Sequence, residues 1–181
     1  GASTIATDSA ASLALIQRAV RDPNSLRKNP LHRPMLLDIL RLLREREFPA
    51  ESVTALASSR SAGNQDEGVV VEDIEAADLT QFDLALFSAG SGVSEEWPPK
   101  FVDAGAVVVD NSSYWRMDPD VPLVVPEVNR AAIAGYKARG IIANPNCSTI
   151  QMVVALKPIH EAAKIRRVVV STYQSTSGAG K

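Results

Sequence analysis

Short apolar segments alternate along the chain with longer segments of helical periodicity, and this alternation restricts the possible folds more than any other feature. Strands are predicted at 53–57, 68–71, 83–87, 105–110, 141–143 and 166–173. Helices are predicted at 34–47, 94–101 and 148–163, the last with a kink near Pro158. Short apolar strands separated by helices favour a parallel sheet covered by helices on both faces. Ligands of such sheets bind at the carboxyl ends of the strands.

The start of the helix at 94–101 depends on how two adjacent prolines are accommodated. Ser94 is predicted to cap this helix, because serine side chains accept hydrogen bonds from the first unpaired N–H groups. Pro98 and Pro99 must then lie in the first turn or displace the start of the helix, since proline has no N–H to donate.

The composition is that of an ordinary globular protein and excludes several classes of partner. Of the 181 residues, 45% are hydrophobic and 22% are charged, and the net charge is −2. Without a basic excess, a nucleic acid is not expected as a partner. The apolar runs are too short to cross a bilayer, and no secretory signal is expected. One cysteine cannot form an internal disulfide, which fits a cytoplasmic location.

The single cysteine, Cys147, follows the predicted strand at 141–143 and the turn-forming residues 144–146. It directly precedes the helix predicted at 148–163. The first turn of a helix presents unpaired N–H groups and a partial positive charge, which favour a thiolate over a thiol. A cysteine at such a junction is presented partly exposed on a rigid support, so it is a candidate nucleophile. The alternative is a buried structural thiol, since free cysteine is among the most buried residue types.

Six blocks of the sequence together carry a family resemblance. They are 57–63, 85–90, 110–113, 116–129, 144–158 and 171–180. The block at 144–158 begins Asn-Pro-Asn-Cys-Ser-Thr and closely resembles the active-site segment of the aspartate-β-semialdehyde dehydrogenases. The other blocks resemble the same family and occur in its order. The resemblance runs from about Met35 to Lys181.

The resemblance implies an α/β fold made of two parts. A Rossmann-like NADP-binding domain, with a parallel sheet and helices on both faces, is expected over 35–145. Residues 146–181 are expected to form the truncated start of a catalytic and dimerisation domain of the α+β class. Residues 1–34 are an atypical N-terminal segment outside both parts. The family is usually dimeric, so a homodimer is expected.

The resemblance also implies an enzyme, an NADP-dependent phosphorylating aldehyde dehydrogenase. In the family a cysteine thiolate attacks the aldehyde, a hydride passes to NADP, and phosphate cleaves the resulting thioester. The biosynthetic direction converts L-aspartyl phosphate to aspartate semialdehyde, on the route to lysine, threonine and methionine. The expected partners are therefore these small molecules and phosphate.

Five residues are implied to take part in the chemistry. Cys147 matches the nucleophile, and Asn146 is a plausible donor to the developing oxyanion, although asparagine is also common in turns. Gln174 matches the family's active-site glutamine, with an ordinary polar strand end as the alternative. Arg116 matches a phosphate-binding position of the family, and a guanidinium fork suits a tetrahedral oxyanion. The alternative is an ordinary surface arginine. Asn111 matches a residue near the nicotinamide, or satisfies a tight turn.

Three loops are implied to contact the cofactor. Ser58, Ser59, Arg60 and Ser61 follow the strand predicted at 53–57, and arginine with serine hydroxyls suits a 2′-phosphate better than a ribose 2′-hydroxyl. This chemistry favours NADP over NAD. The loop of Ser88, Ala89 and Gly90 matches a second cofactor contact. Ser177 and Gly178 match a third, although glycine-rich stretches are also often linkers. No metal site is predicted.

The N-terminal 34 residues lack a feature expected of this fold. A dinucleotide-binding fold normally opens with an apolar strand and a glycine-rich turn, whereas residues 28–34 contain no glycine. A short helix capped by Asp8 and carrying Val20 is predicted instead, followed by a loop at 21–30. Because the first strand usually lies in the middle of the sheet, its absence would open the sheet's centre. Either residues 1–34 supply a substitute strand, or another chain does, or the chain is an incomplete piece.

Two alternatives to the main functional hypothesis stay open at this point. The family's general-base histidine lies further along than this chain extends, so the chain alone is expected to be poorly active or inactive. One alternative is an acyl-phosphate reductase with another substrate, of the N-acetyl-γ-glutamyl-phosphate reductase type. The other is a non-catalytic fragment that acts as an interaction module, in which case residues 1–34 are the discriminating feature.

Overall fold

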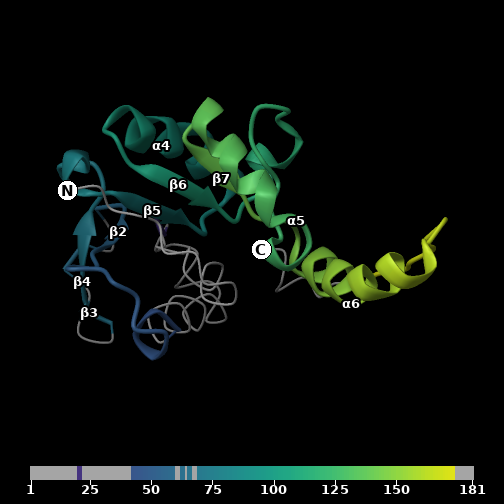
Figure 1. The fold of residues 1–181 in the computed structure, drawn as a ribbon. Helices are drawn as coiled ribbons and strands as arrows, with labels where there is room; N and C mark the ends of the chain where they lie inside the picture. Colours follow the sequence, from purple (N-terminus) through teal and green to yellow (C-terminus); the bar gives the residue numbers. More distant parts are fainter. Residues whose placement is uncertain (1–19, 22–41, 60–61, 64, 67–68, 174–181) are drawn as a thin grey trace.

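The computed structural model describes residues 20–21, 42–59, 62–63, 65–66 and 69–173, and the described strands form two sheets (Figure 1). The first sheet has the order β1-β2-β4-β3 and consists of β1 (Val20–Arg21), β2 (Ala55–Ala57), β3 (Gln65–Asp66) and β4 (Val69–Asp73). The second has the order β5-β6-β7 and consists of β5 (Leu84–Phe87), β6 (Val107–Asp110) and β7 (Ile141–Ala143). All pairs are parallel except β3 with β4. The predicted parallel arrangement is confirmed.

The predicted opening in the centre of the sheet is present among the described residues. β1 pairs with β2, with Val20 opposite Leu56, but no described strand joins this sheet to β5. Val20 therefore lies in a strand and not in the helix predicted for it, which is a correction. Its pairing with β2 satisfies backbone groups that a buried strand edge would otherwise leave unpaired. Asp8 and the remainder of that predicted helix lie outside the described residues.

The three-stranded sheet buries both of its faces. α4 (Ser91–Asp103) covers one face, and the 3-10 helix η3 (Arg130–Ala138) packs on the other (Figure 1). The strand residues that pack with α4 are Ala85, Phe87, Val108, Ile141 and Ala143. Those that pack with η3 are Leu86, Val109 and Ile142. Because successive strand residues face opposite sides, each strand contributes to both layers, which explains why the three strands are apolar except for Asp110 at the end of β6.

The start of α4 differs from the prediction. The helix begins at Ser91 with Gly90 as its N-cap, so Ser94 does not cap it but lies buried within it. Pro98 and Pro99 lie in its second half, where proline usually breaks a helix. Pro98 cannot donate to the carbonyl of Ser94, and the indole N–H of Trp115 donates to that carbonyl at 2.8 Å instead. A contact from outside the helix thus compensates for the missing backbone hydrogen bond.

Three shorter elements complete the architecture around the two sheets. The 3-10 helices η1 (Leu79–Gln81) and η2 (Tyr114–Met117) and the short helix α5 (Pro126–Asn129) were not predicted from the sequence. Of the helix predicted at 34–47, residues 42–47 are described: 42–45 are helical, whereas 46–47 form a turn.

The C-terminal part of the described chain departs from the rest of the fold. α6 (Cys147–Ala163) continues through Pro158 and extends away from the sheets (Figure 1), and none of its residues is buried. The strand predicted at 166–173 is absent: these residues form no strand, and Val168–Val170 are exposed. A strand requires a neighbour for its backbone groups, and the described residues offer none at this position. No helix in the described part of the chain is both long and apolar enough to span a membrane.

Candidate active site

The register of the second sheet brings three strand ends to one level. Phe87 lies opposite Asp110, and Asp110 lies opposite Ala143. Ser88, Asn111 and Asn144 are therefore the first residues after β5, β6 and β7 at a shared edge. The prediction that candidate residues gather at the carboxyl ends of strands is confirmed for this sheet.

A fully buried carboxylate anchors this edge. Asp110 accepts hydrogen bonds from the Ser94 hydroxyl at 2.9 Å, the Ser112 backbone N–H at 3.1 Å and the Ser112 hydroxyl at 2.5 Å. Burial raises the pKa of this carboxyl above its ordinary value of 3.8, while the hydrogen bonds from Ser112 and Ser94 and the charge of Arg116 act in the opposite direction. Asp110 therefore joins α4, β6 and the loop that leads to η2.

Arg116, on η2, is held by two backbone carbonyl groups. Its Nε donates to the Asn144 carbonyl at 2.9 Å, and its Nη2 donates to the Asn111 carbonyl at 2.9 Å. These bonds occupy one edge of a half-buried guanidinium that has five N–H groups in a fixed plane. Within the described part of the chain Arg116 has no further hydrogen bond or ion pair, so the Nη1 end of the group is available to an oxyanion.

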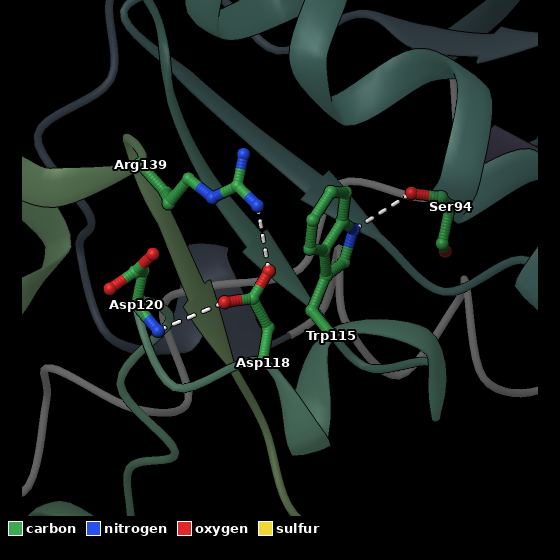
Figure 2. Close-up of polar contacts among 5 residues, drawn as sticks. All are labelled: Ser94, Trp115, Asp118, Asp120 and Arg139. Atoms are coloured by element: carbon green, nitrogen blue, oxygen red, sulfur yellow. Dashed lines mark hydrogen bonds and ion pairs between the residues drawn. The ribbon is translucent and has the colours of Figure 1, made fainter.

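The element that carries Arg116 is itself fixed on either side (Figure 2). Trp115 is anchored to Ser94 through its indole N–H, and the Arg139 guanidinium lies 5.8 Å from its ring centroid. Arg139 also donates to the Asp118 carboxylate at 2.9 Å. The backbone N–H of Asp120 and the Arg139 guanidinium hold the pKa of Asp118 below its ordinary value. η2 is thus tied both to α4 and to the residue that follows η3.

Two asparagine side chains link the ends of β6 and β7. The Asn144 amide Nδ2 donates to Asn111 Oδ1 at 2.6 Å, and the Asn144 backbone N–H donates to the Asp110 carbonyl at 2.8 Å. The other side-chain oxygen of this pair, Asn144 Oδ1, is buried and has no hydrogen-bond partner among the described residues. An unpaired buried acceptor costs about 1–3 kcal/mol.

Cys147 is the first residue of α6, and its thiol is exposed. The alternative expectation of a buried structural thiol is therefore wrong. Asn146 caps the helix, because its Oδ1 accepts from the Ser148 backbone N–H at 3.0 Å and from the Ser148 hydroxyl at 2.6 Å. No described residue bonds the carboxamide Nδ2 of Asn146, which can therefore donate to a ligand. The predicted strand-turn-helix junction is confirmed, since β7 ends at Ala143, four residues before the cysteine.

The predicted cofactor residues lie at two separate strand ends. Ser58 and Ser59 follow β2 in the first sheet, and the Ser58 hydroxyl is buried without a hydrogen-bond partner in the part of the chain that the structure describes. Ser88 and Ala89 are half-buried after β5, and Gly90 caps α4. A Cβ added at Gly90 would meet no atom within 4 Å, so space remains beside this backbone. The predicted site residues that lie outside the described residues are Arg60, Ser61, Gln174, Ser177 and Gly178.

Sequence reasoning missed three residues that shape this edge: Asp110, Ser94 and Asn144. A signal for Asp110 exists in the sequence, because an acidic residue ends the apolar run 106–109. Ser94 and Asn144 carry no such signal, since serine in a helix and asparagine before proline are common. Among the described residues no three His, Cys, Asp or Glu side chains gather as metal ligands.

Comparison with known families agrees with this geometry. Residues 37–136 match the family model described as "Semialdehyde dehydrogenase, NAD binding domain". The chain belongs to this family. The match includes two of the three strand ends, those followed by Ser88 and Asn111, and the whole of η2, and it ends shortly before β7.

Similar proteins are semialdehyde dehydrogenases by name. The chain is 56% identical over 146 residues to the aspartate-semialdehyde dehydrogenase of Aquifex aeolicus, a match covering 78% of this chain and 43% of that protein. It is 54% identical over 147 residues to aspartate-semialdehyde dehydrogenase 2 of Vibrio cholerae, covering 79% and 44% respectively. The chain thus spans less than half the length of these relatives. Neither alternative raised from the sequence is favoured by these similarities.

Solved structures of the same kind share the fold. Aspartate semialdehyde dehydrogenase II from Vibrio cholerae matches with a TM-score of 0.76 and 48% identity, over 90% of this chain and 48% of that one. A second structure of that enzyme, described as complexed with ASA, matches with a TM-score of 0.67 and 54% identity, over 70% and 42%. The Rossmann-like fold class predicted from the sequence is therefore confirmed.

Proposed function

We propose that this chain carries the NADP-binding part and the nucleophile of an aspartate-semialdehyde dehydrogenase. The observation that carries the proposal is the arrangement at the ends of β6 and β7. The exposed Cys147 begins α6 four residues after the end of β7. The Arg116 guanidinium, whose Nη1 end is available, is bonded to the carbonyl of Asn144, three residues before that cysteine. The chemistry requires both a thiolate nucleophile and a cationic ligand for phosphate.

In this proposal Cys147 attacks the aldehyde carbon of aspartate semialdehyde to form a thiohemiacetal. NADP, when bound, would accept the hydride that leaves this carbon, so that the carbon stays on Cys147 as a thioester. Phosphate then attacks the thioester and releases aspartyl phosphate and the thiolate. The N-terminus of a 17-residue helix stabilises negative charge at Cys147 and at the developing oxyanion. The Nδ2 of Asn146 is the side-chain donor to that oxyanion, since its Oδ1 is already used in capping.

Arg116 is proposed to bind the phosphate through the Nη1 end of its guanidinium, the end without protein partners among the described residues. Asn111 contributes at the nicotinamide side of the same edge, where its backbone N–H is bonded to the Phe87 carbonyl at 2.8 Å. Gln174 completes the catalytic set as a contact to the substrate.

The cofactor is proposed to be NADP. The turn after β2 offers the hydroxyl groups of Ser58, Ser59 and Ser61 and the guanidinium of Arg60 to a 2′-phosphate, without a competing acidic residue in the turn. The unpaired buried hydroxyl of Ser58 supports a ligand in this place. Ser88, Ala89 and Gly90 line the second contact, where the N-terminus of α4 favours a negative charge. Ser177 and Gly178 form the third.

The division of the chain and its assembly belong to the same proposal. Residues 35–145 form the cofactor domain, and residues 146–181 begin the catalytic and dimerisation domain. The exposed α6 and the exposed apolar side chains of Val168–Val170 support this division, because surfaces of this kind are normally covered by further protein. A homodimer is the proposed assembly.

A single-turnover experiment on the purified chain tests the function. The chain is mixed with aspartate semialdehyde and oxidised NADP without phosphate, so that the thioester cannot be released. This format suits a chain that is expected to be poorly active, because one slow turnover is enough: we expect NADPH to form slowly, up to one equivalent, and an aspartyl adduct to appear on Cys147 by mass spectrometry. Both should be absent in Cys147→Ala and retained in Thr149→Ala, a change of an exposed neighbour on the same helical turn. Absence of both products, together with no calorimetric binding of NADP, would refute the proposal.

A further inference from the structure

The two carbonyl groups that hold Arg116 belong to the two residues whose side chains are bonded to each other. Asn111 and Asn144 accept from Nη2 and Nε through their backbone carbonyls, and their carboxamides meet at 2.6 Å. The Nε and Nη2 hydrogens are parallel and a fixed distance apart, so they require two acceptors at matching separation. The carboxamide bond ties together the residues that carry these two acceptors.

Asn144 is the more constrained member of the pair. Its backbone N–H donates to the Asp110 carbonyl at 2.8 Å, its carbonyl accepts from Arg116, and its Nδ2 donates to Asn111. Pro145 follows it and restricts its backbone to extended conformations. Within the described ranges, Oδ1 is its one polar atom left without a partner, although it is buried. Its other polar groups therefore hold the backbone and the carboxamide in place, while one buried oxygen is left unsatisfied.

We propose that Asn144 is a positioning residue, whose carboxamide sets the plane of the Arg116 guanidinium so that its Nη1 end faces an incoming oxyanion. This inference rests on the proposed role of Arg116 as the phosphate ligand. Asn144 itself does not contact the phosphate. It acts through Arg116, by keeping the Asn111 and Asn144 carbonyls at the separation that the Nε–Nη2 edge requires.

The chemistry of the amide explains why asparagine suits this position. Asn111 Oδ1 needs a donor, and Nδ2 of Asn144 supplies one without adding charge. An aspartate in place of Asn144 would put a carboxylate oxygen, an acceptor, against Asn111 Oδ1, which is also an acceptor. It would also bring a negative charge close to Arg116, which would weaken the attraction of the guanidinium for phosphate.

The test follows the Arg116 Nε–H signal in nitrogen-15 NMR spectra of the full chain, assigned by its loss in Arg116→Lys. In Asn144→Ala we expect this proton to exchange with water at least about tenfold faster, and the affinity for inorganic phosphate to fall about 10–100-fold, the range found when outer partners of metal ligands are removed. Asn144→Asp, which keeps the shape of the side chain, should lower phosphate affinity as well. It covers the case in which the alanine variant does not fold.

Asn129→Ala provides the matched control. Asn129 also bonds two backbone groups, accepting from the Val125 N–H at 2.8 Å and donating to the Leu123 carbonyl at 2.9 Å, but it does not contact Arg116. It should change neither the exchange rate nor phosphate affinity. If the Asn144 variants change the Arg116 signal and phosphate affinity no more than Asn129→Ala does, the positioning role is overturned. If the unmodified chain does not bind phosphate, the proposed function fails, whereas the exchange rate still tests the positioning of Arg116.

Discussion

The contact between Trp115 and α4 allows a sharp test of how the two prolines are tolerated in that helix. In Trp115→Phe the aromatic ring is kept but the indole N–H is lost, so the Ser94 carbonyl is left without its 2.8 Å hydrogen bond. Because Ser94 is fully buried and Pro98 has no N–H, neither water nor the helix backbone can replace that donor. The Arg139 guanidinium can still lie over a phenyl ring (Figure 2).

The expected cost has two parts. An unpaired buried carbonyl costs about 1–3 kcal/mol. The smaller ring leaves part of a buried site unfilled and adds about 1 kcal/mol, judged from the cost of deleting a few buried carbon atoms. We therefore expect Trp115→Phe to lower the free energy of unfolding by about 2–4 kcal/mol. Trp97→Phe is the matched control on α4, because Trp97 is only half-buried and has no hydrogen bond among the described residues. Its cost should stay below about 1 kcal/mol.

Urea unfolding followed by far-ultraviolet circular dichroism measures these values without depending on tryptophan fluorescence. The decisive measurement is a double-mutant cycle with Pro98→Ala. An alanine at this position restores an N–H that can donate to the Ser94 carbonyl, as in an uninterrupted helix. Trp115→Phe should then cost about 1–2 kcal/mol less than it does beside Pro98. Equal costs in the two backgrounds would refute the view that Trp115 compensates for the proline.

Two further predictions concern backbone strain and a buried charge. Gly140→Ala should destabilise the fold by about 2–4 kcal/mol, because Gly140 has a φ of +68° and an added Cβ would lie 2.6 Å from Val102 Cγ1. At Gly105 φ is +101° and an added Cβ would meet no atom within 4 Å, so Gly105→Ala should lower the free energy of unfolding by only about 1–2 kcal/mol. Equal costs of the two substitutions in urea unfolding would contradict a steric contribution at Gly140. The pKa of Asp110 is raised in the native state, so between pH 3.8 and that raised pKa its carboxyl is protonated in the native state and ionised in the unfolded state. The free energy of unfolding should therefore fall as pH rises from 3.8 through that raised pKa. Asp110→Asn should remove this fall. If the pH profile of the urea midpoint is the same in Asp110→Asn as in the unmodified chain, the assignment of this pH dependence to Asp110 is wrong.

The sequence alone predicted strands β2, β4, β5, β6 and β7 and the junction that carries the cysteine, but neither β1 nor β3. A continuous apolar run such as 141–143 is stable only when both of its faces are buried. The position of such a strand can therefore be predicted from the composition of a few neighbouring residues. The turn at Asn146 and the helix after it followed from local chemistry, since asparagine caps a helix through its own nearest neighbours. These are short-range effects, and periodicity reports them directly. The strand predicted at 166–173 shows the limit of this reasoning, because apolar content predicts a strand only where another strand lies beside it.

Only the tertiary structure decided which side chains meet at the strand ends. Arg116 bonds the carbonyl of Asn144, 28 residues further along, and Trp115 bonds a carbonyl 21 residues before it. These contacts depend on the register of β5, β6 and β7 and on how α4 packs across them, which no local window of sequence contains. Ser94 illustrates the same point, because the hydroxyl expected to cap a helix instead donates to the buried Asp110. Burial makes such polar groups seek partners wherever the fold supplies them, and long-range geometry therefore overrides local preference.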